Sequence, residues 1–175
     1  MFGLSKKIDW EERGSQAASI IVVNAADLTN AVTKDAKKKI KDDKYVDIFI
    51  FNAALLLIGQ DRQAFVSLKD TDRNKFSDAI YFGITTEVCK ALKLEGEHWA
   101  AVAAQLNQGT TELGKYAQKL FADKDESPKG TLYWEYGKLL YQKFDLDPAI
   151  GITGGLMAAE VAINVSSQTK DWWPR

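Results

Sequence analysis

Apolar residues recur along this chain at intervals of three and four positions, the spacing that places side chains on one face of an α-helix. The clearest stripe begins at Trp99, ends at Phe121 and includes Val102, Leu106 and Leu113. Strict alternation of apolar and polar residues, which is the pattern of a half-buried strand, is hard to find. The sequence therefore predicts an all-α fold.

Helix boundaries are indicated by capping residues and prolines. Ser127 precedes Pro128 and Asp147 precedes Pro148, and each pair is typical of a helix start. Periodicity and boundaries together predict about six helices, over residues 15–41, 45–68, 71–96, 97–122, 129–144 and 149–167. Residues 1–14 are predicted to be a lead-in, and residues 168–175 a short tail that contains Trp172 and Trp173.

The segment from Val46 to Ile58 is apolar on every side, which is typical of a helix in the middle of a bundle. A chain of 175 residues suits one domain with a sizeable core, and no Gly-, Ser- or Pro-rich linker divides residues 1–175. We therefore expect a single-domain helical bundle or array with this segment at its centre.

Charge and hydropathy exclude some partners. The chain has 23 basic and 24 acidic side chains, a balance that argues against a nucleic-acid partner. Lysines gather between Lys34 and Lys44, but interleaved aspartates indicate a solvated helix end. The apolar stretch 45–59 is shorter than the roughly 20 residues of a membrane span. The N-terminal residues lack the layout of a secretory signal, so we expect a cytoplasmic protein with no membrane span.

A metal site is the first candidate chemistry. Glu95 and His98 have the Glu-x-x-His spacing found in carboxylate-bridged di-iron bundles. Such bundles need a second histidine, which the chain lacks, and Gly96 is expected to end one helix between the two residues. No nucleophile motif or phosphate-binding glycine pattern stands out, and Cys89 fits a core position. We therefore expect no metal and no cofactor.

A polar pocket is the second candidate. Helical spacing places Glu87 on the same arc as Ile80, and Asp47 and Asn52 interrupt the apolar central segment. These three side chains either orient a small ligand inside the bundle or form a structural hydrogen-bonded network with an arginine or a tyrosine. The first alternative predicts a small-molecule-binding protein or enzyme with its pocket near Glu87.

An interaction surface is the third candidate. Trp134 and Tyr141 lie on a second stripe of the fifth predicted helix, and the last predicted helix has two apolar faces. Amphipathic aromatic residues are enriched at interfaces, so Trp134, Tyr141, Trp172 and Trp173 are the predicted contact residues. Alternatively, the tail tryptophans fill a groove on the fifth helix. We expect a non-enzymatic helical interaction or scaffold protein that binds a protein partner or forms a homo-oligomer.

Overall fold

A computed structural model describes residues 8–34, 40–94 and 96–174 of the chain. These residues form six α-helices and two short 3₁₀ segments and contain no strand, which confirms the predicted all-α fold. In chain order the elements are α1 (Trp10–Lys34), α2 (Asp42–Ser67), α3 (Asp70–Ala91), η1 (Gly96–His98), α4 (Trp99–Gly114), α5 (Leu132–Phe144), α6 (Pro148–Thr169) and η2 (Lys170–Trp172).

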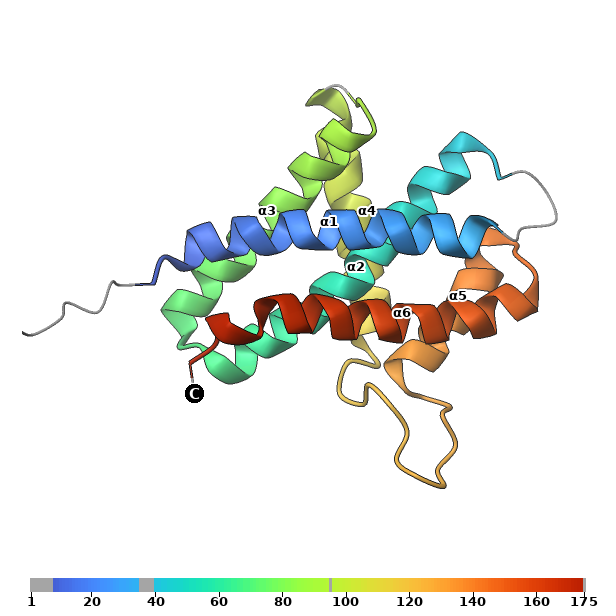
Figure 1. The fold of residues 1–175 in the computed structure, drawn as a ribbon. Coiled ribbons are helices and arrows are strands. Elements are labelled where there is room, and N and C mark those ends of the chain that lie inside the picture. Colours follow the sequence, from blue (N-terminus) through green and yellow to red (C-terminus); the bar gives the residue numbers. More distant parts are fainter. Residues whose placement is uncertain (1–7, 35–39, 95, 175) are drawn as a thin grey trace, which may run out of the picture.

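Helix α2 lies at the centre of the fold, as its composition predicts. Every residue from Ile48 to Ile58 is buried, and α2 contacts each of the other five helices. Figure 1 shows α1 and α6 side by side across one face of the molecule, with α2 crossing behind them. A helix with neighbours on all sides needs apolar residues on all sides, which explains its continuous apolar run.

The core has two parts, and both include residues of α1 and α2. One part surrounds α3 and the start of α4, where Phe76, Ile84 and Leu106 are buried. The other surrounds α5 and α6, where Leu140 is buried and Tyr136 is buried against α2. The second part of the core supports the surface that α5 and α6 present to solvent.

The first helix begins earlier than its apolar stripe suggests. Trp10 starts α1, inside the segment predicted as a lead-in. The Asp9 side chain accepts hydrogen bonds from the backbone N–H groups of Glu11 and Glu12, at 3.0 and 3.2 Å, and caps the helix.

The fourth and fifth helices also differ from their predicted bounds. Helix α4 ends at Gly114, not at residue 122, and residues 115–131 form turns and a loop. The apolar stripe nevertheless continues, because Tyr116, Ala117 and Leu120 still contact the core. Helix α5 starts at Leu132, three residues after the predicted start at 129. The helix start predicted at Asp147 is correct. Its carboxylate accepts a hydrogen bond of 3.0 Å from the Ala149 N–H, and Pro148 is the first residue of α6.

Candidate functional site

Helices α5 and α6 approach so closely that their backbones touch. A Cβ atom added to Gly137 would lie 2.3 Å from the carbonyl oxygen of Gly151, and one added to Gly155 would lie 2.7 Å from the carbonyl oxygen of Tyr133. Real Cβ atoms do not approach backbone oxygens this closely, so only glycine fits these positions. We call Gly137, Gly151 and Gly155 the glycine seam.

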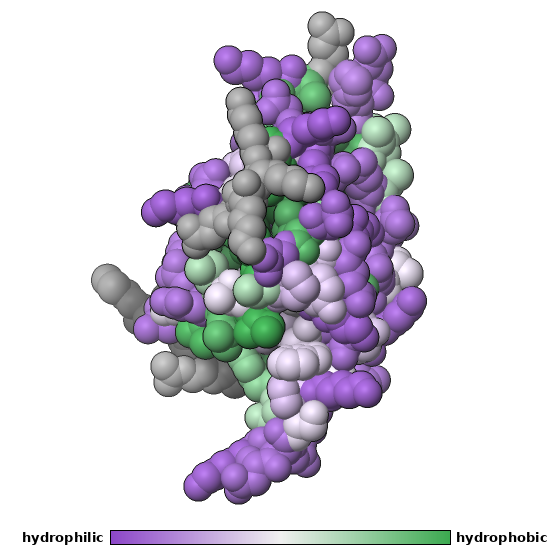
Figure 2. All heavy atoms as spheres, turned by 90° about the vertical axis from the view of Figure 1, so that its right-hand side faces the viewer, coloured by the Kyte–Doolittle hydropathy of each residue, from purple (hydrophilic) through white to green (hydrophobic). Residues whose placement is uncertain are grey.

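An apolar groove of about 310 Å³ lies along the outer side of the glycine seam. Its walls come from α5, from the first half of α6 and from the loop that precedes α5. The lining residues are Leu120, Phe121, Ala122, Pro128, Thr131, Tyr133, Trp134, Lys138, Tyr141, Gly151, Ile152, Gly155, Leu156 and Ala159. Figure 2 shows apolar side chains at the surface on this side of the molecule, above the hydrophilic loop. We call this feature the α5/α6 groove.

The wall formed by α6 is unusually exposed for an apolar surface. Ile152 is 62% exposed and Leu156 is 70% exposed. Ile163 continues the same face beyond the groove and is also exposed. The opposite face of α6, which includes Ala158 and Val165, is buried in the core. One of the two apolar faces predicted for this helix therefore has no partner among the described residues.

The segment Pro148–Trp172 is long and apolar enough to cross a membrane by length and composition, with a mean hydropathy of 1.4 in its most apolar window. Only 28% of that window is buried. Helix α6 nevertheless packs on α1 and α5, and it carries the exposed Glu160 near its middle. The apolar run of α6 thus combines a face that is buried in the bundle with an exposed outer face. The sequence analysis considered a membrane span only for the stretch 45–59.

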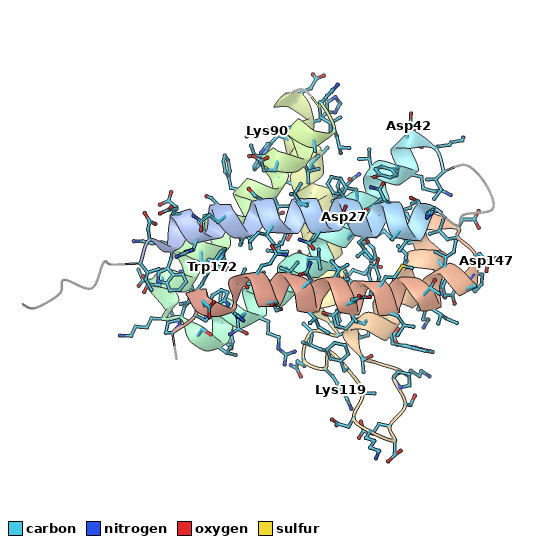
Figure 3. All side chains as sticks on the ribbon, in the orientation of Figure 1. Asp27, Asp42, Lys90, Lys119, Asp147 and Trp172 are labelled. Atoms are coloured by element: carbon cyan, nitrogen blue, oxygen red, sulfur yellow. The ribbon has the colours of Figure 1, made fainter. Side chains whose placement is uncertain are left out.

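The structure separates the four predicted contact residues into two pairs. Trp134 and Tyr141 both line the α5/α6 groove. Trp173 instead stacks on Trp10 with ring centroids 5.9 Å apart, and the Arg13 guanidinium lies 4.9 Å above the Trp172 ring. Figure 3 places Trp172 beside the start of α1, at the opposite end of α6 from Asp147. The tail therefore closes one end of the bundle and does not fill a groove on α5.

The three predicted ligand residues do not come together. Glu87 lies on the surface of α3, where its Oε1 is 2.7 Å from the Nζ of Lys90 and its side chain is 39% exposed. Asp47 is exposed and accepts a hydrogen bond of 3.2 Å from Gln105, at the edge of a separate surface depression. Asn52 is fully buried. These residues therefore do not line one pocket inside the bundle.

Asn52 belongs to a buried hydrogen-bonded chain that links three helices. The Tyr136 hydroxyl donates to Asn52 Oδ1 at 2.6 Å, and Asn52 Nδ2 donates to Thr29 Oγ1 at 2.8 Å. Thr29 in turn donates to the Ala25 carbonyl oxygen. Of the three residues, only Asn52 forms part of a structural network with a tyrosine, the alternative to a ligand site that the sequence left open.

Burial raises the pKa of two tyrosines near the groove. Desolvation raises the pKa of Tyr133 to about 12, although the charge of Arg62 opposes part of this shift. Full burial raises the pKa of Tyr136 well above its usual range. Both side chains therefore stay protonated in the folded protein at pH values where they ionise in the unfolded chain.

This difference predicts that the protein loses stability in alkaline solution. Above pH 10 the unfolded state releases tyrosine protons that the folded state retains, so the free energy of unfolding falls as pH rises. The expected slope is about 1.4 kcal/mol per pH unit for each buried tyrosine. Urea unfolding of Tyr136→Phe between pH 10 and 12 should show a free energy of unfolding that falls with pH less steeply than that of the wild type, by this amount. An unchanged slope would contradict the prediction, and measurements at pH 8 give the common baseline.

Among the described residues, no three His, Cys, Asp or Glu side chains come together as a cluster that could hold a metal ion. His98 is exposed in η1, where its Nε2 lies 3.8 Å from Oε1 of Glu97. Glu95, the other residue of the Glu-x-x-His spacing, lies outside the described residues, as do the lysines at positions 37–39. Cys89 is buried, and burial raises the pKa of its thiol, which disfavours the reactive thiolate.

Two features of this region were not predicted from the sequence. Leu120 and Phe121 line the groove from a loop, although their spacing predicts helix. Gln60 is buried at a smaller cavity beside the groove.

Comparison with known protein families, with curated proteins and with solved structures gives no match for this chain.

Proposed function

We propose that this chain is a non-enzymatic helical interaction protein that self-associates through the α5/α6 groove and the outer face of α6. One observation carries the proposal: the exposed apolar row of Ile152, Leu156 and Ile163 lies next to an apolar groove that contains Trp134. Contiguous exposed apolar surface of this kind marks interaction sites in soluble proteins.

A second copy of the chain is the occupant that this shape favours. Ile152 and Leu156 of the α6 row form one exposed wall of the groove, and Ile163 extends this wall beyond it. A surface that combines a ridge and a groove is self-complementary when two copies meet about a twofold axis, because the ridge of each copy enters the groove of the other. Trp134 and Tyr141 then become buried at the centre of the contact, where aromatic residues contribute most to binding.

Light scattering tests self-association. The wild-type protein is expected to have twice the 19.5 kDa mass of one chain. Leu156→Lys should reduce the mass to that of one chain, because a lysine in the buried contact carries a charge without a partner. Charged substitutions at Trp134 and Tyr141 should have the same effect. Ala104→Lys is the matched control, since it adds the same charge at an exposed position of α4.

A wild-type protein that remains a monomer at high concentration would contradict the proposal. Sedimentation with vesicles of phosphatidylcholine and phosphatidylglycerol in equal parts then identifies the main competitor. If the monomer pellets with the vesicles and Leu156→Lys abolishes this binding, the α6 face binds a lipid surface instead. Circular dichroism of each variant must match the wild type, so that loss of association is not loss of folding.

A further inference from the structure

A small cavity of about 140 Å³ lies beside the α5/α6 groove, between α2 and α6. Leu120 and Tyr133 line both spaces, so these two side chains stand between the cavity and the groove. Part of the cavity wall is aliphatic and includes the buried Leu56 and Val165, and the rest is polar. A wall of this mixed composition suits a small molecule with one polar and one apolar end.

The charge of the wall indicates the sign of the polar end. Among the described residues that line the cavity, Arg62 is the only charged one, and none is an aspartate or a glutamate. Its guanidinium donates to the Ala117 carbonyl oxygen and forms no ion pair with a described residue. A guanidinium has five N–H donors in a geometry that matches a carboxylate, so donors remain for a ligand. The cavity therefore favours an anion, because a cation would lie beside this positive charge.

The Tyr133 hydroxyl is the second polar group that faces this region. Tyr133 is only 8% exposed, yet its hydroxyl has no hydrogen-bond partner among the described residues. Buried hydroxyl groups are normally hydrogen-bonded, because an unpaired one loses its hydration without compensation. The raised pKa of Tyr133, about 12, keeps this hydroxyl protonated at neutral pH, so it is able to donate a hydrogen bond. The charge of Arg62 acts on the same hydroxyl, which places the two groups near each other.

The size of the cavity limits the apolar end. An engineered protein cavity of roughly 150 Å³ holds benzene, so a molecule of about six non-hydrogen atoms fits here. Because Arg62 is exposed, a charged group beside it keeps part of its hydration, which reduces the cost of desolvation. A short aliphatic tail then gains contacts with Leu56 and Val165 that water does not make.

We propose that this cavity binds a short aliphatic carboxylate, whose carboxylate group accepts hydrogen bonds from Arg62 and from the Tyr133 hydroxyl, and whose tail packs against Leu56 and Val165. The inference goes beyond self-association and does not depend on it, because the cavity is lined by residues of one protomer. Leu156, at the centre of the proposed contact, is not among the lining residues.

Calorimetric titration of the full-length chain with butanoate and butanamide tests the proposal. The two probes have the same chain, but butanamide is uncharged. Butanoate should bind at least about tenfold more tightly, because hydrogen bonds between charged groups are stronger than those of a neutral amide. Arg62→Gln should abolish this preference. Arg73→Gln is the matched control and should leave it unchanged, since Arg73 pairs with Asp70 and does not line the cavity.

Two further measurements examine the hydroxyl and the tail. Tyr133→Phe should weaken butanoate binding by about fivefold to tenfold, because the carboxylate loses one donor. This variant should stay folded, since the hydroxyl that it removes has no partner in the protein. Acetate should bind about tenfold more weakly than butanoate, because it lacks two methylene groups that the aliphatic wall buries.

Four outcomes would overturn the proposal. They are the absence of butanoate binding, equal affinity for butanoate and butanamide, a preference for butanoate that survives Arg62→Gln, and binding of inorganic phosphate as tight as that of butanoate. Leu156→Lys should bind butanoate as the wild type does. A wild-type monomer that binds butanoate would therefore contradict self-association alone, whereas a dimer that does not bind it would contradict this inference alone.

Discussion

Asn52→Leu is expected to lower the free energy of unfolding by about 2 to 3 kcal/mol, because it leaves the buried Tyr136 hydroxyl without its acceptor. Leucine has a similar volume and adds apolar contacts, so the loss reports the hydrogen bonds and not an empty space. Thr29 keeps the bond that it donates to the Ala25 carbonyl oxygen, so the cost arises mainly at Tyr136.

A double-mutant cycle with Tyr136→Phe isolates this interaction. Tyr136→Phe alone leaves Asn52 Oδ1 without its donor and should cost about 1 to 3 kcal/mol. The double variant removes both polar groups, so its loss should be smaller than the sum of the two single losses by more than about 1 kcal/mol. Urea unfolding measures all four proteins. Additive losses would contradict the proposed coupling between α2 and α5.

A matched substitution separates this effect from the general effect of replacing asparagine by leucine. Asn107 is exposed on α4, and Asn107→Leu should change the free energy of unfolding by no more than about 0.5 kcal/mol. A comparable loss at Asn107 and Asn52 would mean that the buried chain contributes nothing specific. A large difference would establish Asn52 as a structural residue, in place of the ligand role considered from the sequence.

The central helix and the two faces of α6 were predictable because they depend on local periodicity. The run from Ile48 to Ile58 has apolar residues on all sides, and only a helix with neighbours all round buries such a run. Ile152 and Leu156 fall on one side of the last helix, and Val165 falls on the other. Periodicity distinguishes the two sides, but it does not say which of them the rest of the fold covers.

The contents of the candidate sites were less predictable because they depend on pairs distant in sequence. Asn52 and Tyr136 are 84 positions apart, and only the packing of α2 on α5 brings their side chains together. The same reason explains the tail, where the partners of Trp173 are Trp10 and Phe76. Gln60 gives no local signal, since a glutamine that follows an apolar run is ordinarily solvated.

The glycine seam is not recognisable from local sequence, because it depends on which helices pack together. The glycines of α6 allow a close approach, but Gly137 is the residue that they meet, and it lies on another helix. A glycine allows another backbone segment to pack closely, but the sequence does not identify which segment packs there. The seam sets the spacing between α5 and α6, and therefore the width of the groove on their outer side.

Gly137→Ala is therefore expected to lower the free energy of unfolding by about 2 kcal/mol, because overpacking typically costs about 1 to 3 kcal/mol and a contact with backbone places the clash at the upper end of this range. The new Cβ would lie 2.3 Å from the Gly151 carbonyl oxygen, which moves only if α6 moves. Alanine favours helix by about 1 kcal/mol over glycine, so the expected loss is the clash less this gain. Urea unfolding at neutral pH measures the difference.

Gly59→Ala is the matched control, because Gly59 also lies within a helix but has no atom within 4 Å of an added Cβ. This variant should gain about 0.5 to 1 kcal/mol, from helix propensity alone. The opposite signs expected at the two glycines follow from backbone contact at one and open space at the other. A gain of similar size at Gly137 would mean that α5 and α6 separate without cost, in which case the glycine seam does not fix the width of the groove.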